Sequence, residues 1–154
     1  MIERNDIPKN YGISNVDEYT KKAIESYNKG NIIEAFVVLH SILEMELNMV
    51  WNIFVFSIVR TNPRPAPKPK DYSDLVDLLY ELELLNERQY SILRDFHTGR
   101  NEAVHHLASH MKRKVGISKM HARFKSGLKA AKIVDEVLLK TAKNSFPKSL
   151  FSKK

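Results

Sequence analysis

One long segment constrains the fold more than any other part of the sequence. It begins after Gly30 and Asn31, and apolar side chains recur in it every three or four positions as far as about Arg60. This spacing is helical, and the apolar positions cover so much of the circumference that the helix must be packed on several sides. They are Ile32, Ala35, Phe36, Leu39, Ile42, Leu43, Met45, Leu47, Val50, Trp51, Phe54, Val55 and Ile58. The segment predicts the central helix of a bundle.

The same segment is not expected to cross a membrane. A transmembrane helix needs about 20 mostly apolar residues. Here Glu44, Glu46, Asn48 and Asn52 interrupt every candidate span. We therefore expect no membrane partner.

Capping residues and breaks on either side of this segment predict further helices. Ser14 to Asp17 opens a first helix that Gly30 ends, and the proline-rich run 61–70 forms an extended loop. The remaining helices are expected from Asp71 or Ser73 to Leu85, from Glu87 to about His110, and from a cap at Ser118 to about Lys143. The pattern predicts an all-α, up-and-down bundle of four to five helices.

Composition supports one helical domain over residues 1–154, with its core at about 16–143 and a flexible basic tail at 144–154. The length fits a single domain, and five Gly and six Pro are few for a sandwich or barrel. Cysteine is absent, which excludes a disulfide scaffold and a thiolate metal site. The absence of cysteine, together with a polar N-terminus that lacks a targeting segment, favours a cytoplasmic location.

Charge is distributed unevenly along the chain. Residues 1–99 hold 11 Lys/Arg and 15 Asp/Glu, whereas residues 100–154 hold 14 Lys/Arg and 3 Asp/Glu. Such a split favours a polyanionic partner for the C-terminal third. The alternative is that a lysine-rich helix only keeps the protein in solution.

Four of the six histidines lie close together, at His97, His105, His106 and His110. Positions 106 and 110 are one helical turn apart, a spacing that can present two nitrogens to one metal ion. No acidic residue with suitable spacing accompanies them, since Glu102 stands alone nearby. We therefore expect no metal and no cofactor.

A second arrangement is the segment Arg100-Asn101-Glu102-Ala103-Val104-His105. Asn101 and His105 share one helix face, which His97 extends by a turn if Gly99 does not break the helix. Arg100 falls within the apolar stripe of the same helix. An unpaired guanidinium is costly to bury, so Arg100 needs a carboxylate partner, a kink in the helix or an interface. Two interpretations remain open: a structural ion pair with Glu44 or Glu46, or an Arg, an amide and a His converging on a phosphate.

The form R-N-x-x-x-H on a helical domain of this size resembles the HEPN superfamily (higher eukaryotes and prokaryotes nucleotide-binding). Arg100, Asn101 and His105 match its motif, and His106 also fits. The segments ILRDF and AFVVLHSILEMELNMVW resemble the family's usual context. The resemblance spans roughly residues 16–143.

The resemblance implies a metal-independent endoribonuclease that works as a homodimer. Arg100, Asn101 and His105 would be catalytic, with His97, His106 and Glu102 in support. Histidine suits proton transfer at neutral pH, and Arg100 offers a planar fork for phosphate oxygens. Asn101 would orient the histidine or donate to the phosphate.

RNA would be held by basic residues of the C-terminal third. They are Lys112, Arg113, Lys114, Lys119, Arg123, Lys125, Lys129 and Lys132. The resemblance also suggests a toxin of a toxin–antitoxin or defence system, with a nucleotidyltransferase-type antitoxin as partner. The alternative is a non-catalytic helical module that binds a nucleotide, an RNA or a protein.

Overall fold

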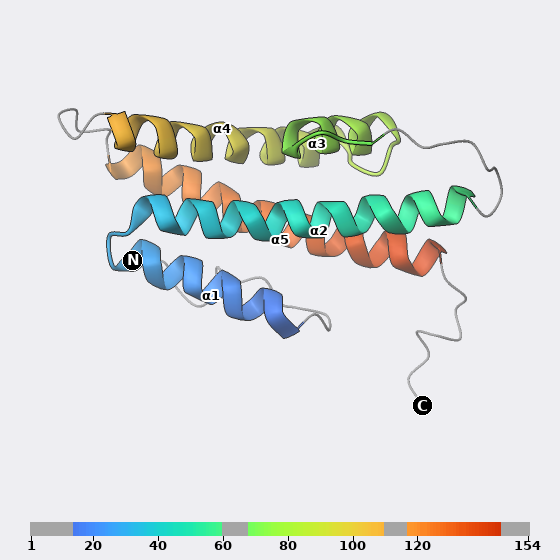
Figure 1. Ribbon diagram of the computed structural model, residues 1–154, viewed down its shortest axis with the longest axis horizontal. Helices are drawn as coiled ribbons and strands as arrows, with labels where there is room; N and C mark the ends of the chain where they lie inside the picture. Colours follow the sequence, from blue (N-terminus) through green and yellow to red (C-terminus); the bar gives the residue numbers. More distant parts are fainter. Residues whose placement is uncertain (1–13, 60–67, 110–116, 146–154) are drawn as a thin grey trace.

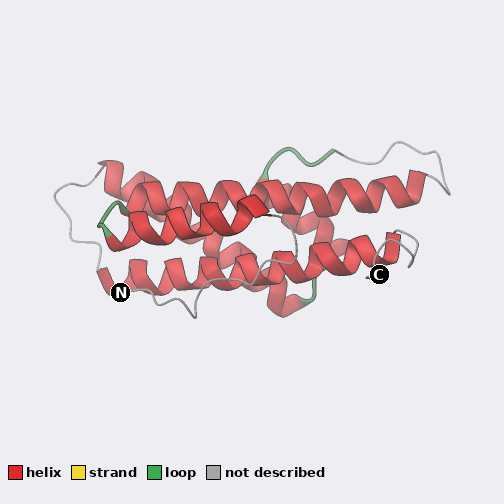
Figure 2. Ribbon diagram, turned by 90° about the horizontal axis from the view of Figure 1, so that it is seen from below, coloured by secondary structure: helices red, strands yellow, loops and turns green. Residues whose placement is uncertain are grey.

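The computed structural model describes residues 14–59, 68–109 and 117–145, and this part of the chain is helical with no strand (Figure 1, Figure 2). Its helices are α1 (Ser14–Asn28), α2 (Ile32–Val59), α3 (Tyr72–Glu81), α4 (Glu87–Ser109) and α5 (Ile117–Ser145). The predicted all-α bundle is confirmed.

Helix α2 lies at the centre of the bundle. It contacts each of the other four helices, and α4 also packs on α3 and α5. Figure 1 shows α1 and α4 running in one direction and α2 and α5 in the other, the up-and-down arrangement expected from short connections. The central position explains why α2 is apolar over so much of its surface.

Several helix ends follow the predicted local chemistry. Gly30, with a φ of 85°, takes the left-handed conformation that ends α1. Asp71 caps α3 by accepting from the backbone N–H of Asp74 at 3.0 Å. Asn86 and Gln89 form a reciprocal capping box at the start of α4, with distances of 3.0 and 2.9 Å.

Two predicted boundaries are wrong. Helix α3 ends at Glu81 rather than Leu85, because Glu83 takes a φ of 58° and the backbone N–H groups of Leu84 and Leu85 turn back to the Leu79 carbonyl. Helix α5 begins at Ile117, so Ser118 lies inside its first turn and is not its cap. Most of the proline-rich loop and residues 146–154 lie outside the described residues.

Aromatic rings from three helices form the centre of the core. Phe36 stacks on Phe96 at a centroid distance of 5.9 Å and meets Phe124 edge-on at 5.5 Å. Gly127 of α5 makes room for this packing, since a Cβ there would lie 2.8 Å from Leu39 and still closer to the Phe96 ring.

Two residues of the apolar set on α2 do not join this core. Met45 and Ile58 are exposed at 44% and 37%. Both therefore lie on the solvent side of α2, whereas the spacing alone counted them with the buried positions.

Two carboxyl groups are buried between α2 and α5. Glu46 is fully buried and Asp135 is nearly so, and a hydrogen bond shared with Asp135 is the only one that the Glu46 carboxyl can make within the described chain. Burial raises the pKa of Glu46 well above its usual range, and the charge of Asp135 and the shared hydrogen bond raise it further. Glu46 therefore keeps its proton at neutral pH and donates it to Asp135.

Candidate functional site

The R-N-x-x-x-H segment lies on α4, which continues as a helix through Gly99. Gly99 is buried against α5, where an added Cβ would come within 3.0 Å of the Arg123 side chain. This glycine thus allows close packing of α4 on α5 and does not break the helix. His97 and Asn101 are accordingly one turn apart on one face.

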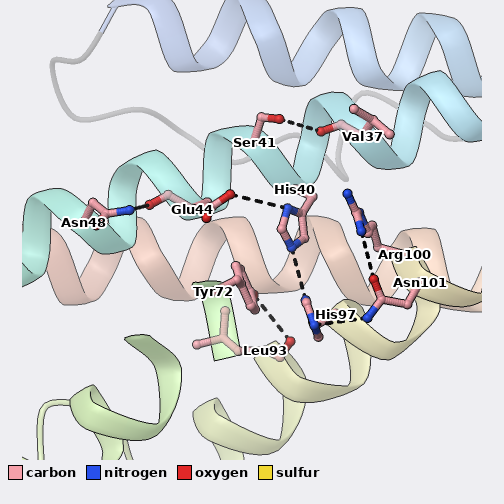
Figure 3. A network of polar contacts seen from close by, with 10 residues as sticks. All are labelled: Val37, His40, Ser41, Glu44, Asn48, Tyr72, Leu93, His97, Arg100 and Asn101. Carbon is pink, nitrogen blue, oxygen red and sulfur yellow. Dashed lines mark hydrogen bonds and ion pairs between the residues drawn. The ribbon is translucent and has the colours of Figure 1, made fainter. Parts of the chain in front are cut away.

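Four side chains form a continuous polar network between α2 and α4: His40, His97, Asn101 and Arg100 (Figure 3). His40 Nε2 lies 3.1 Å from His97 Nδ1, and His97 Nε2 lies 3.1 Å from Asn101 Nδ2. Arg100 Nη1 donates to Asn101 Oδ1 at 2.9 Å. At the other end, His40 Nδ1 faces Glu44 Oε2 at 3.8 Å.

Helix α3 covers this network with the ring of Tyr72. The ring stacks on His97 at a centroid distance of 5.0 Å and an interplanar angle of 7°, and it lies 4.6 Å from the ring of His40. Its hydroxyl donates to the Leu93 carbonyl at 3.4 Å. Tyr72 is buried, and burial together with the charge of Glu44 raises the pKa of its hydroxyl.

Both histidines are neutral at physiological pH. Burial lowers the pKa of His40, and the charges of Arg100 and His97 add to this effect, which brings the pKa to about 4. Burial also lowers the pKa of His97, helped by Arg100 and Arg94 and opposed by Asp71 and Glu44. Each imidazole therefore has one N–H donor and one acceptor nitrogen.

Arg100 is half-buried and has no carboxylate partner within the described residues. The considered ion pairs with Glu44 and Glu46 do not form, because Glu44 faces His40 and Glu46 bonds to Asp135. The Nε of Arg100 is buried and has no hydrogen-bond partner in this part of the chain. Within the described residues, its positive charge thus has no anionic partner.

Two other predicted site residues, His105 and Glu102, also lie on α4. His105 is exposed, one turn beyond Asn101 on the same helix. Glu102 forms ion pairs with Lys119 at 3.2 Å and Arg123 at 3.5 Å. The side chain of His106 is outside the described residues.

The basic residues expected to hold RNA divide into two groups. Lys119 and Arg123 bind acidic side chains of α4, where Arg123 also pairs with Asp95. Lys125 and Lys129 are exposed on α5, and Lys132 is half-buried. Lys112, Arg113 and Lys114 lie outside the described residues. The exposed pair is therefore the best placed for a polyanion.

Sequence reasoning missed His40 and Tyr72 as members of the site, and it considered Glu44 as a partner of Arg100 and not of His40. His40 lies within the apolar face of α2, 57 positions before His97, and no local motif connects the two. A signal was available, since a histidine at a core position must find a polar partner.

No group of three or more histidine or acidic side chains in the described ranges is placed to hold a metal ion. None of the helices in those ranges combines the length and apolar content that a membrane crossing requires. Comparison with family models, curated proteins and solved structures finds no match to this chain.

Proposed function

We propose that this protein is a cytoplasmic, metal-independent endoribonuclease of the HEPN type that acts as a homodimer. The observation that carries the proposal is the environment of the Arg100 side chain. Its guanidinium is oriented by Asn101, lacks a carboxylate partner in the described chain and has a donor without an acceptor. A phosphate group supplies the oxygens that such a planar fork binds best.

The chemistry follows from the residue types. Cleavage of RNA requires removal of the proton from the 2′-hydroxyl, stabilisation of a negatively charged phosphorane and protonation of the 5′-oxygen. Arg100 stabilises the phosphorane, and Asn101 holds the guanidinium in place. His105 is exposed and transfers protons. His97 supports the site through its contact with Asn101.

Helix geometry favours a dimer. Residues five apart on a helix point about 140° away from each other, so one α4 cannot easily aim both Arg100 and His105 at the same phosphate. A two-fold axis beside this face would bring the Arg100 of one protomer to the His105 of the other. It would also supply two histidines for the separate base and acid roles.

Cleavage assays in EDTA test the proposal. We expect Arg100→Ala and His105→Ala to lower the rate by about 10²–10³, while Arg88→Ala, an exposed change on the same helix, leaves it unaltered. Arg100→Lys should also be inactive, because a point charge cannot replace the fork. Cleavage of DNA, a requirement for a divalent ion, or full activity in His105→Ala would overturn the proposal.

Exposed Lys125 and Lys129 favour a second candidate, a non-catalytic module that binds RNA. It predicts salt-dependent RNA binding without cleavage in the same assays. In the catalytic case the chain would act as the toxin of a toxin–antitoxin or defence system, and a nucleotidyltransferase-type antitoxin would be its partner. Co-purification with such a protein would test this assignment.

A further inference from the structure

The polar network has a direction that the chemistry of Arg100 fixes. A guanidinium has only N–H donors and no acceptor. The Asn101 atom 2.9 Å from Arg100 Nη1 must therefore be the amide oxygen, because the flipped amide would place its NH₂ group against another donor. The NH₂ group of Asn101 then faces His97 (Figure 3).

The direction passes from Asn101 into His97. Because the amide NH₂ donates to His97 Nε2 at 3.1 Å, this nitrogen must be the acceptor. A neutral imidazole has a single hydrogen, so the hydrogen of His97 lies on Nδ1. Nδ1 is the atom that faces His40, and it donates to His40 Nε2 at 3.1 Å.

The same rule settles the tautomer of His40. Its Nε2 accepts, so its hydrogen lies on Nδ1, 3.8 Å from the carboxylate of Glu44. An ionised carboxylate can accept hydrogen bonds but cannot donate one. The Nδ1–H of His40 directed at Glu44 fits this requirement. In every contact from Arg100 to Glu44, one donor thus faces one acceptor. If the donor and acceptor of any single contact were exchanged, two donors or two acceptors would face each other elsewhere in the network.

We propose that His40, His97 and Glu44 are positioning residues that hold the Asn101 amide with its oxygen toward Arg100. Both histidines are neutral, and each has its hydrogen on Nδ1. Their role is to fix the orientation of the guanidinium. That this orientation prepares Arg100 for phosphate rests on the proposed function. The assignment of the two histidine tautomers is independent of that function.

A proton added to His97 would break the network. Both ring nitrogens would then donate, so His97 Nε2–H would meet the NH₂ of Asn101. The amide would have to rotate, which turns its NH₂ toward the guanidinium and releases Arg100. In the described chain the charged or titratable groups that face the two histidines are Glu44 of α2, Asp71 and Tyr72 at the start of α3, and Arg94 and Arg100 of α4.

Nitrogen NMR of the full-length protein tests the tautomers. In a ¹⁵N-labelled sample at neutral pH, long-range ¹H–¹⁵N spectra distinguish the protonated from the unprotonated ring nitrogen of each histidine. We expect Nδ1–H for both His40 and His97. An Nε2–H form of either ring in the wild type overturns the inference.

Substitution of Arg100 tests the direction itself. Arg100→Ala removes the donor that orients Asn101, so His97 and the more distant His40 should shift toward a mixture of tautomers. Arg94→Ala is the matched control, because Arg94 also acts electrostatically on His97 but donates to Ser73. Unchanged tautomers in Arg100→Ala, or an equal change in Arg94→Ala, would contradict the proposal.

Substitution of His40 separates this inference from the proposed function. His40→Gln keeps an acceptor near the position of Nε2 and should retain Nδ1–H in His97, whereas His40→Leu should lose it. A wild type with the expected tautomers but no RNA cleavage would refute only the proposed function. Cleavage together with an Nε2–H form of His97 would refute only the positioning role.

Discussion

Glu46 and Asp135 make the stability of the fold depend on pH, and substitution of Glu46 by Gln isolates this dependence. In the folded state, burial raises the pKa of Glu46 above 4.5, which is the ordinary value and the one expected in the unfolded chain. Above that pH the unfolded chain releases the proton and the folded chain keeps it. The free energy of unfolding therefore falls as pH rises, until the pH reaches the raised pKa of the folded state.

The size of the effect follows from one retained proton. One pH unit corresponds to about 1.4 kcal/mol, so between pH 5 and pH 7 the wild type should lose up to about 2.7 kcal/mol relative to the variant. Glu46→Gln keeps a donor toward Asp135 but has no proton to release. For a chain of this length that difference corresponds to roughly 5–10 °C in melting temperature.

The assay is thermal unfolding followed by circular dichroism at pH 5, 6 and 7. The variant should gain melting temperature relative to the wild type as pH rises. Glu136→Gln is the matched control, since Glu136 is exposed beside Asp135 and should show little change. Parallel pH profiles of the wild type and Glu46→Gln would refute the reasoning.

Three further predictions concern packing, capping and charge. Gly127→Ala should cost about 1–3 kcal/mol of stability, because its Cβ would overlap the Phe96 ring; a wild-type melting curve would contradict this. Asn86→Ala should cost about 1 kcal/mol through loss of the capping box, and denaturant unfolding that leaves the midpoint unchanged would count against it. Charge reversal at Lys125 and Lys129 should weaken binding to all RNA sequences and reduce its salt dependence; unaltered filter binding would leave these lysines a role in solubility only.

Local chemistry predicted most of the fold. Gly30 and Asn86 mark helix ends through their own backbone or side-chain bonds, so the residue type alone is informative. The end of α3 was missed because it depends on tertiary packing. Leu85 is buried only if the chain turns back after Glu81, and a helical pattern continued through it equally well.

The candidate site was predicted in part. The spacing placed His97 one turn from Asn101 on the same face, and the two side chains do interact, whereas the contact of Arg100 with Asn101 was not predicted, because adjacent residues of a helix do not ordinarily face each other. His40 and Tyr72 come from other helices, and only the packing of α2 and α3 on α4 brings them to His97. Sequence spacing carries no information on such pairs. The catalytic role of His105 stays a prediction.

The ring of Tyr72 links the site to the least extensive helix of the described bundle. Helix α3 has ten residues and is held by the buried side chains of Tyr72, Leu75, Val76 and Leu79. A helix of this length is not stable alone in water. Local opening of α3 would uncover the imidazole faces and remove the desolvation that keeps them neutral. The free energy of that opening, measurable by amide hydrogen exchange, therefore sets the fraction of molecules in which the histidine pair is exposed to solvent protons.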